Sequence, residues 1–575
     1  APVEIEKSRF TIVDTGDSLP DGMNAVIMVE DIIEQGDKIR LIAPAVPWQH
    51  VRQIGEDFSA GDMLACSGTV LTPALLGALV AGGVAQVSVV RQPLIILIPT
   101  GDEIVPPTDE PAPGLIPDFN STVYGKQLEA DGALVEVMPI IPDVPELIQN
   151  ALAAALVRAD LVMLLAGSSA GRDDLSTQVI ESQGEVILHG IAIRPGKPTI
   201  LGLCEPRSVS GRIQQQKPVI GLPGYSVSGL IVLEEIVRPL LRQVYQLEID
   251  DRLCVEARLS RRLVSSLKYR EYIRVRLTRS EGQLIASPLE RGAGILTSFA
   301  KADGLLVVPR DSEGFDEGST VTVRLLRPMS RIEQALSVIG SHDPLLDEMA
   351  DLMVQLKRPA TAGATLSSIH AGSMGGILAV RRHEAQIAGI HLLDEKTGDY
   401  NIAYVQRFFP AGNVLLIEGV RRQQGLLVQR GNPLQIKDLA DIAERQLRYV
   451  NRQKGAGTRL LLDYHLAKAG YAPEQLSGYS REEYTHTGVA AQIASGSADA
   501  GLAILSVARM SGLDFLPLAE ENYDFLIDAK AWELPSVQQF IAVLQSEAFR
   551  QRLEQLGGYR LEQPGRIIMG PGPLA

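Results

Sequence analysis

Leu94-Ile95-Ile96-Leu97-Ile98-Pro99, followed at once by Thr100-Gly101-Asp102-Glu103, is the stretch that decides the fold of the central part of the chain. A short, uninterrupted apolar run of this kind is typical of a strand buried on both faces of a parallel sheet. Thr100, Gly101 and the two carboxylates would lie at the carboxyl end of that strand, where such sheets bind their ligands. The loop suits a phosphate or a hydrated Mg²⁺, and an ordinary turn is the simpler alternative.

Strand-like and helix-like segments alternate along the chain after this run. Their ranges are 120–130, 145–158 and 226–244 for helices, and 134–141, 160–166, 186–193 and 218–221 for strands. This alternation predicts a doubly wound α/β domain over residues 91–248, with its ligand site at the carboxyl ends of the strands.

Three further loops of this domain have the composition of an anion site. Residues 166–174 form a Gly/Ser-rich loop between a strand and a helix, where free N–H groups would face an anion. Residues 193–198 place Arg194 and Lys197 on a turn framed by Pro195 and Pro198. Residues 221–228 again run from a strand through a glycine turn into a helix. The four loops together predict a site for a phosphate-bearing ligand.

The regions on either side predict other folds. Residues 1–90 are rich in Gly, Pro and β-type residues, with a short strand expected at 25–29, and indicate a β-rich region. Residues 249–328 predict a small β-barrel, 329–358 a helical connector, and 359–575 a second α/β unit. The whole chain is therefore expected to be a multi-domain α/β protein.

Composition limits the partners of the chain. A net charge of −15 over 575 residues argues against non-specific binding to nucleic acid or to an anionic membrane. The three cysteines make no CxxC pair, which fits a reducing cytosol better than a disulfide framework. We find no secretion signal and no membrane span, so a cytoplasmic location is expected. The sequence starts at Ala1 without Met, and we expect a truncated start.

The four loops, in this order, resemble the molybdopterin molybdotransferase family, to which the gephyrin E domain also belongs. The resemblance covers residues 1–328 and includes Asp14-Thr15-Gly16 with 19–22, and Gly55-Glu56-Asp57 with 61–62 and 71–73. It implies transfer of molybdenum from molybdate to adenylated molybdopterin with Mg²⁺, releasing AMP. It also implies a homodimer whose active site is completed across the subunit interface.

Carried over position by position, the resemblance assigns roles to individual residues. Positions associated with activity are Thr15, Glu103, Asp143, Asp174, Pro195 and Pro198. Positions expected to bind the pterin substrate are Thr100, Gly101, Asp102, Gly167, Ser168, Ser169, Gly171, Lys197, Gly224 and Ser226. Glu103 and Asp174 are the expected Mg²⁺ ligands. Asp143, which precedes Pro145 and Glu146, and Asp174 are equally suited to capping a helix, and Glu103 could be a solvated loop carboxylate.

The sequence departs from the family pattern at three places. Ser168 replaces a glycine, and Tyr225 and Ser226 stand where the family has Asn and Pro. The family's "MDGYA" segment would lie before Ala1. These departures keep a rival hypothesis open, in which the protein is a non-catalytic molybdate or cofactor-binding sensor.

Residues 359–575 resemble the type 2 periplasmic-binding-protein superfamily, which implies two lobes. The motifs are Ser367–Ser373, Lys454–Arg459 and Gly496–Gly501. Small hydroxyls and N–H groups at helix starts suit a tetrahedral oxyanion, and we expect molybdate or tungstate. The expected binding residues are Ser367, Ser368, Ser373, Gly457 and Thr458, each of which could instead be an ordinary cap. The domain would then be a cytosolic sensing or substrate-feeding module.

Overall fold

The computed structural model describes residues 3–165, 175–206, 215–280, 282–356, 365–394 and 397–570. These fall into two compact units, Ala1–Arg91 and Gln92–Ala575. Each unit is described by itself.

The first unit holds one small sheet and one helix. Three antiparallel strands in the order β1-β3-β2 make the sheet, with bounds β1 Glu4–Glu6, β2 Ile32–Gln35 and β3 Lys38–Leu41. Helix α1, Pro73–Ala81, starts after Thr72, whose Oγ1 accepts a hydrogen bond from the backbone N–H of Leu75 at 3.2 Å. Of residues 25–29, where we expected a strand, 25–28 are irregular and Val29 begins a short 3-10 helix, Val29–Asp31. The N–H of Val26 donates to the carbonyl of Gln49 in a loop rather than to a strand.

The predicted doubly wound domain opens the second unit. Its six-stranded sheet has the order β7-β4-β8-β12-β11-β9, with bounds β4 Leu94–Pro99, β7 Leu134–Val137, β8 Leu161–Leu165, β9 Gly184–His189, β11 Ile200–Cys204 and β12 Lys217–Leu222. The first four strands are parallel. The sheet therefore has an edge at which four carboxyl ends meet.

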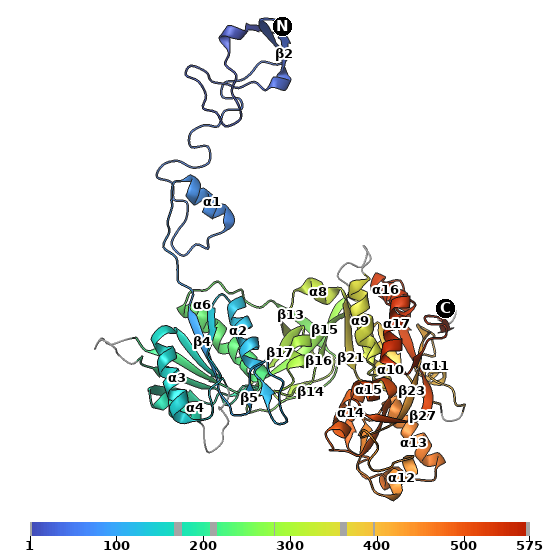
Figure 1. Cartoon of the computed structure of the whole chain (residues 1–575). Coiled ribbons are helices and arrows are strands. Elements are labelled where there is room, and N and C mark those ends of the chain that lie inside the picture. The colour runs from blue at the N-terminus through green and yellow to red at the C-terminus, as the bar shows by residue number, and fades with distance from the viewer. Residues whose placement is uncertain are drawn as a thin grey trace. The chain divides into compact units, whose positions relative to one another are not determined.

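Helices cover both faces of this sheet. One face packs against α2 Asn120–Ala130, α5 Ser226–Val232 and α6 Arg238–Val244, and the other against α3 Pro145–Arg158 and α4 Leu175–Glu181. Figure 1 shows α3 and α4 on one side of β4, and α2 and α6 on the other. The single helix expected over 226–244 is interrupted by a π-helical turn, Leu233–Val237.

The expected barrel follows and is closed. Five strands form a ring because β15 pairs with both β16 and β17, the bounds being β13 Cys254–Leu259, β15 Arg270–Ser280, β16 Gln283–Pro288, β17 Gly304–Val308 and β19 Thr320–Leu325. A short helix that we did not expect, α7 Leu296–Lys301, lies between β16 and β17. Strand β10, Ile193–Arg194, leaves the α/β domain to pair with β15.

The C-terminal sheet crosses two hydrophobic cores. Its order is β21-β20-β22-β27-β23-β26-β24-β25, with bounds β20 Ala335–Gly340, β21 Thr365–His370, β22 Ile387–Ile390, β23 Val414–Val428, β24 Tyr449–Arg452, β25 Glu482–Glu483, β26 Ala500–Ile504 and β27 Asp514–Asp528. Strands β28 Tyr559–Arg560 and β29 Ile567–Met569 pair with β23. We expected two strands over 414–430, whereas β23 is one strand with register shifts.

The two cores define two lobes. In the first lobe, β20, β21, β22 and residues 414–420 of β23 pack with α9 Leu345–Gln355, α10 Gly372–Arg381, α11 Ile402–Phe408, α16 Pro535–Leu544 and α17 Glu547–Leu556. In the second lobe, β24, β26 and residues 426–428 of β23 pack with α12 Leu439–Glu444, α13 Gly457–Lys468, α14 His486–Ala494 and α15 Leu505–Met510. The long strands β23 and β27 run through both lobes.

The segment 329–358, expected to be a helical connector, contains a strand. Between α8, Met329–Glu333, and α9 lies β20, which pairs in parallel with β21 and contacts β22. The apolar run Ala335–Gly340 is buried in the first lobe, so this segment belongs to the C-terminal domain.

Candidate functional site

Three strand ends of the α/β domain lie side by side. Leu165 of β8 pairs directly with Pro99 of β4 and with Leu222 of β12. The loops that begin at residues 100 and 223 therefore leave the sheet on either side of Leu165, the last described residue before the stretch 166–174. This brings together two of the four loops that the sequence singled out.

Thr100 and Gly101 set the path of the first loop. The N–H and the hydroxyl of Thr100 both donate to the carbonyl of Leu165, at 2.9 and 3.3 Å. The N–H of Gly101 donates to the carbonyl of Ile141 at 3.2 Å, and its φ of +138° favours glycine. These two residues therefore position the loop, and Asp102 and Glu103 present its charged side chains.

Three carboxylates gather at this edge. Asp102 Oδ1 accepts a hydrogen bond from the N–H of Asp143 at 3.2 Å. Burial, together with the charges of Glu103 and Asp102, raises the pKa of the Asp143 carboxyl. Val144, not Asp143, is the N-cap residue of helix α3, and this helix has no hydrogen bond from an N-cap side chain. Asp143 is therefore not the N-cap of α3, and its role in a site stays a prediction.

A cleft opens beside these carboxylates. Its volume is about 600 Å³, and it is lined by Gly101, Asp102, Ile104, Pro106, Pro107, Asp118, residues 137–140 and Pro142. Asp118, which we did not single out, also accepts a hydrogen bond from the N–H of Ser121 at 3.0 Å at the start of α2. Across residues 3–165 and the other described ranges, no group of three His, Cys, Asp or Glu side chains is arranged to hold a metal ion.

Asn120 holds the third loop in place and was missed by our sequence reasoning. Its Nδ2 donates to the carbonyl of Gly224 at 2.9 Å, and its Oδ1 accepts from Ser226 Oγ at 2.7 Å. The side chain of Ser226 is therefore buried and used within the protein. Tyr225 between them is 66% exposed and is the side chain of this loop that faces solvent.

The Pro195–Pro198 turn lies away from the start of α5. Backbone bonds from Gly190 to Thr199 and from Ile191 to Lys197 close it, at 2.8 and 2.9 Å. A Cβ on Gly196 would lie 3.4 Å from Val232 at the other end of α5. Lys197 is exposed. The described contacts do not bring Lys197 together with Asp102 or Gly224.

Other expected site residues are not placed with these. Gly167, Ser168, Ser169, Gly171 and Asp174 lie outside the described residues. Thr15 belongs to the first unit, where it is exposed in a turn.

In the C-terminal domain the two predicted loops meet. The N–H of Met374 donates to the carbonyl of Gly455 at 3.4 Å, and a Cβ on Gly372 would lie 3.3 Å from the same oxygen. Ser373 Oγ accepts from the N–H of His391, and Thr458 Oγ1 accepts from Gln424 Nε2, both at 3.1 Å. Both hydroxyls are therefore engaged in hydrogen bonds within the protein.

Ser367, Ser368 and Gly457 have different surroundings. By the alternation of β21, Ser367 shares a face with Ile369, which packs on the hydrophobic core under α10. Ser368 lies on the opposite face and is half-buried. Gly457 is where α13 starts, and a Cβ there would lie 2.1 Å from the carbonyl of His391, so only glycine fits.

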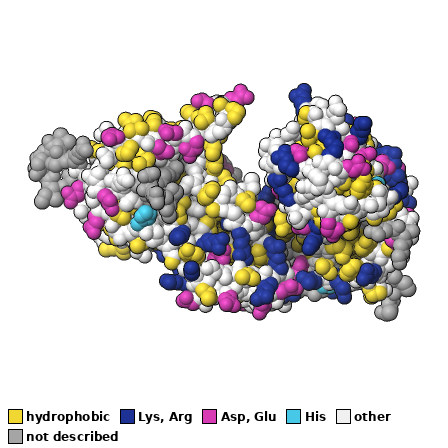
Figure 2. Space-filling model, turned by 90° about the horizontal axis from the view of Figure 1, so that it is seen from below, with side chains coloured by type: hydrophobic (Ala, Val, Ile, Leu, Met, Phe, Trp, Pro, Cys, Tyr) yellow, Lys and Arg dark blue, Asp and Glu magenta, His cyan; other side chains and the backbone are white. Residues whose placement is uncertain are grey.

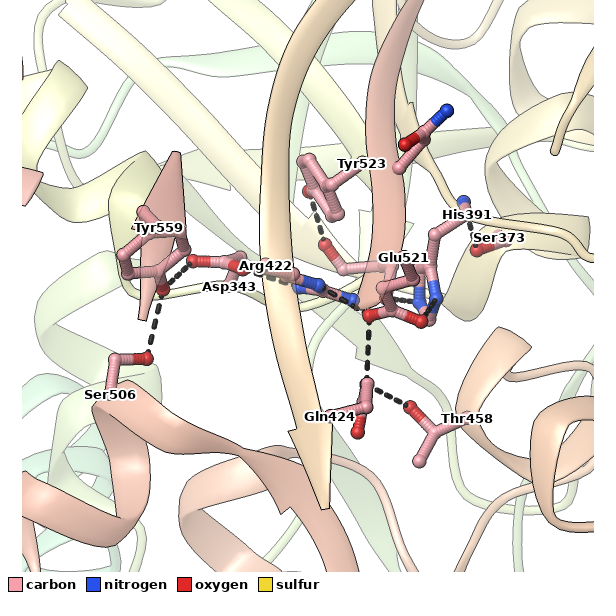
Figure 3. A network of polar contacts seen from close by, with 12 residues as sticks. Asp343, Ser373, His391, Arg422, Gln424, Thr458, Ser506, Glu521, Tyr523 and Tyr559 are labelled. Carbon is pink, nitrogen blue, oxygen red and sulfur yellow. Dashed lines mark hydrogen bonds and ion pairs between the residues drawn. The ribbon is translucent and has the colours of Figure 1, made fainter. Parts of the chain in front are cut away.

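A buried ion network lies where the paired strands β23 and β27 pass from one lobe to the other (Figure 3). Arg422 pairs with Asp343 and, through Nε at 2.5 Å, with Glu521, and its guanidinium stacks on Tyr523. Glu521 Oε2 also contacts His391 Nδ1 at 2.9 Å. Burial opposes ionisation of Glu521, but Arg422 and His391 outweigh it and lower its pKa to about 2.

This network was missed by sequence reasoning, although one signal was present. Six of the eight histidines fall between residues 342 and 486: His342, His370, His383, His391, His465 and His486. A local excess of histidine is unusual for a domain expected to bind through hydroxyls and N–H groups alone.

The surface adds two observations. On the face drawn in Figure 2, Lys and Arg side chains gather along the middle of the molecule with Asp and Glu among and around them. No helix in the described part of the chain combines the length and apolar character needed to cross a membrane.

Comparisons with known families cover both halves of the chain. Three matching models are the MoeA N-terminal region (domains I and II) at residues 1–83, the probable molybdopterin-binding domain at 96–243, and the MoeA C-terminal region (domain IV) at 256–326. A PBP superfamily domain matches residues 355–545.

Individual relatives agree with these assignments. The Haemophilus influenzae molybdopterin molybdenumtransferase is 30% identical over 55% of this chain and 77% of its own length. The Bacillus subtilis protein YvgK is 35% identical over 34% of this chain and 64% of its own length. A solved molybdopterin biosynthesis MoeA protein from Pyrococcus horikosii is 35% identical, covering 53% of this chain and 72% of that chain with a TM-score of 0.43. The chain therefore belongs to the molybdopterin molybdenumtransferase family of molybdenum-cofactor biosynthesis enzymes, and it carries an additional PBP-like domain.

Proposed function

We propose that the α/β domain inserts molybdenum from molybdate into adenylated molybdopterin and releases AMP. The observation that carries this proposal is the row formed by Pro99, Leu165 and Leu222, which brings the acidic loop and the glycine turn to one edge of the sheet. The Gly/Ser-rich stretch follows Leu165 directly in the sequence. An adenylated pterin needs phosphate-binding donors beside groups that handle a metal, and these loops supply both kinds.

The residues present fit a magnesium ion. Mg²⁺ prefers oxygen ligands and usually keeps several waters, so one or two carboxylates are enough. Glu103 and Asp174 are the proposed ligands. Burial and, after it, the charges of Glu103 and Asp102 raise the pKa of Asp143. The charge repulsion supports this assignment, because a divalent cation near Asp102 and Glu103 would offset it. When bound, Mg²⁺ would neutralise charge on the phosphates of the adenylate.

The protein's own groups hold the substrate around that ion. Thr100 and Gly101 keep the acidic loop fixed to β8 and to the segment after β7, while Asn120 fixes the glycine turn. Lys197 is proposed to pair with a pterin phosphate, with the donors of residues 167–171 beside it. Pro195 and Pro198 would hold that lysine in its turn.

Thr15 is proposed to take part in the same reaction. A homodimer and a cytoplasmic location are part of the proposal. The PBP-like domain is proposed to bind a small oxyanion, for which molybdate and tungstate were the sequence-based expectation.

The test is AMP release from adenylated molybdopterin by the full chain, with and without molybdate and Mg²⁺. Release that requires both ions supports the enzyme. Tight binding of the adenylate or of molybdate without any release would instead support the rival function, a non-catalytic sensor.

A further inference from the structure

Three imidazoles and one guanidinium meet between the lobes of the C-terminal domain. His342 follows β20 and His370 ends β21 in the first lobe, whereas Arg452 ends β24 and His486 opens α14 in the second. The rings of His342 and His370 have centroids 4.5 Å apart, and those of His342 and His486 are 6.1 Å apart. Contact between the lobes therefore runs through these rings.

Arg452 is a buried cation that pairs with no carboxylate within the described part of the chain. It is 1% exposed, and its Nε and Nη2 donate only to neutral oxygens of Gln453, Glu483 and Tyr484, at 3.3, 3.2 and 2.9 Å. Nη1 has no hydrogen-bond partner among the described residues. Burial and the charge of Arg422 lower the pKa of Arg452 to about 9, so it is still charged at pH 7. The charges of Glu521 and Glu483 act on Arg452 in the opposite direction, but neither carboxylate forms an ion pair with it over the ranges that the structure describes. A buried charge without a paired counter-charge is costly, which points to an anionic ligand.

The three imidazoles are neutral at pH 7. Burial and the neighbouring cations hold the pKa values of His342 and His486 well below the usual value, and lower that of His370 to about 4. A neutral imidazole offers one N–H donor and one lone-pair acceptor. The nearby arginines would repel a metal cation, and no metal-binding group of His, Cys, Asp or Glu is found among the residues that the structure describes.

The surroundings of His486 indicate which hydrogen-bonding groups the ligand must have. It is fully buried, and neither Nδ1 nor Nε2 has a partner within the described ranges. In either tautomer one of these nitrogens must donate and the other must accept. Gln424 Oε1 is a second acceptor without a partner in the described structure, and its amide is oriented because Nε2 donates to Glu521 at 2.8 Å. The anion must therefore both accept and donate hydrogen bonds.

We propose that this buried interlobe site, made by His342, His370, His486 and Arg452, binds a small oxyanion that retains a proton at neutral pH, of the hydrogen phosphate or phosphonate class. The inference rests on the proposed oxyanion-binding function of the domain and names the class of anion. Phosphate oxygens accept from Arg452 and from imidazole N–H groups, and the remaining P–OH donates to an unpartnered acceptor such as the second nitrogen of His486. Sulfate and molybdate are fully deprotonated at pH 7 and have nothing to donate, so buried acceptors would disfavour them.

Calorimetric titration of the full chain at pH 7 with phosphate, arsenate, sulfate and molybdate tests this. The α/β domain also suits phosphate, so some of the measured heat of binding can come from there. The heat of binding at the interlobe site is the part that His486→Leu or Arg452→Gln abolishes. Arg550→Gln, a change at an exposed arginine of α17, is the matched control and should retain that heat. We expect phosphate and arsenate to bind at the interlobe site at least about tenfold more tightly than sulfate or molybdate.

A second measurement separates a binding role from a structural one. In anion-free buffer His486→Leu should keep or raise the melting temperature, because it removes a buried polar group without partners. Phosphate should raise the melting temperature of the unchanged chain but not that of His486→Leu. A large loss of stability in His486→Leu, with the phosphate shift intact in Arg452→Gln, would overturn the site.

The other outcomes are also distinct. If molybdate or sulfate binds at the interlobe site as tightly as phosphate, the requirement for a protonated anion is wrong. The proposed role of the domain in binding an oxyanion would still stand. If no anion gives heat that depends on His486 or Arg452, both the inference and the proposed role of the domain fail.

Discussion

Asp143 and Asp102 are joined by a hydrogen bond from the N–H of Asp143 to Oδ1 of Asp102, at 3.2 Å. The bond connects the loop after β4 to the segment after β7, which pairs with β4. It places two carboxylates beside Glu103, and burial together with their repulsion raises the pKa of Asp143. Such an arrangement costs stability unless a cation compensates it, and this is the basis of the first prediction.

Glu103→Gln should slow AMP release by at least about a hundredfold, because it removes a charge that holds Mg²⁺ near the developing charge of the leaving group. The rate is measured in single turnover with molybdate and Mg²⁺ present. Glu110→Gln, an exposed carboxylate further along the same loop, is the control and should leave the rate unchanged. An unaltered rate in Glu103→Gln would show that Glu103 is only a solvated loop carboxylate.

Asp174→Asn separates the two hypotheses for that position. If Asp174 holds Mg²⁺, the variant keeps its melting temperature and loses AMP release by a similar factor. If Asp174 only caps the following helix, Asp174→Asn keeps both stability and rate, because Asn caps as well as Asp, whereas Asp174→Ala loses about 1 kcal/mol of stability and keeps the rate. Measuring both quantities on one preparation decides between them.

Lys197→Ala should weaken binding of molybdopterin by roughly 1.5–3 kcal/mol, the scale for a hydrogen bond to a charged group. The lysine is exposed on a closed turn, so its removal should leave stability unchanged. Fluorescence titration gives the affinity, and Lys126→Ala on the surface of α2 is the matched control. Equal affinity in both variants would remove Lys197 from the phosphate site.

Tyr225 allows a test of the departure from the family pattern. It is exposed on the glycine turn, next to the position that a Cβ on Gly294 would take. If its ring stacks on the pterin, Tyr225→Phe keeps the affinity and Tyr225→Ala loses about 1 kcal/mol. Tighter binding by Tyr225→Ala would instead show that the ring crowds the substrate.

Local sequence predicted the α/β domain well because its signals are short-range. The helices 120–130 and 145–158 have the predicted bounds, and the run 94–99 is a buried strand. Apolar runs and helix periodicity are properties of neighbouring residues, and they do not depend on what lies elsewhere in the chain.

The sites that sequence missed are assembled over long distances. Asn120 reaches Gly224, and Arg422 joins Asp343 to Glu521. No spacing rule links such positions. Strand β20 was assigned to a helical connector for a similar reason, because its pairing partners β21 and β22 come later in the chain. Conversely, Ser367 has the composition of an anion loop but faces a hydrophobic core, since strand alternation decides which face it takes.

The last prediction concerns the junction of the barrel and the C-terminal domain. The carbonyl of Glu384 accepts a hydrogen bond from Thr278 Oγ1 of β15 at 3.3 Å, and the residue is 8% exposed. Burial raises the pKa of its carboxyl to about 7, although Arg382 and Arg258 act in the opposite direction. In the unfolded chain the same carboxyl should titrate near its ordinary value of 4.5.

The folded protein therefore keeps this proton where the unfolded chain loses it. The contribution of Glu384 to stability is complete below about pH 4.5, declines as pH rises, and is lost above about pH 7. Glu384→Gln mimics the protonated form at every pH. Its free energy of unfolding should match that of the unchanged chain at pH 4.5 and exceed it at pH 8, by at most about 3 kcal/mol. Denaturant unfolding at four pH values between these limits measures the difference. Glu533→Gln, at an exposed position, should show no such divergence. A constant difference between Glu384→Gln and the unchanged chain across the range would mean that the Glu384 carboxyl titrates normally in the folded protein.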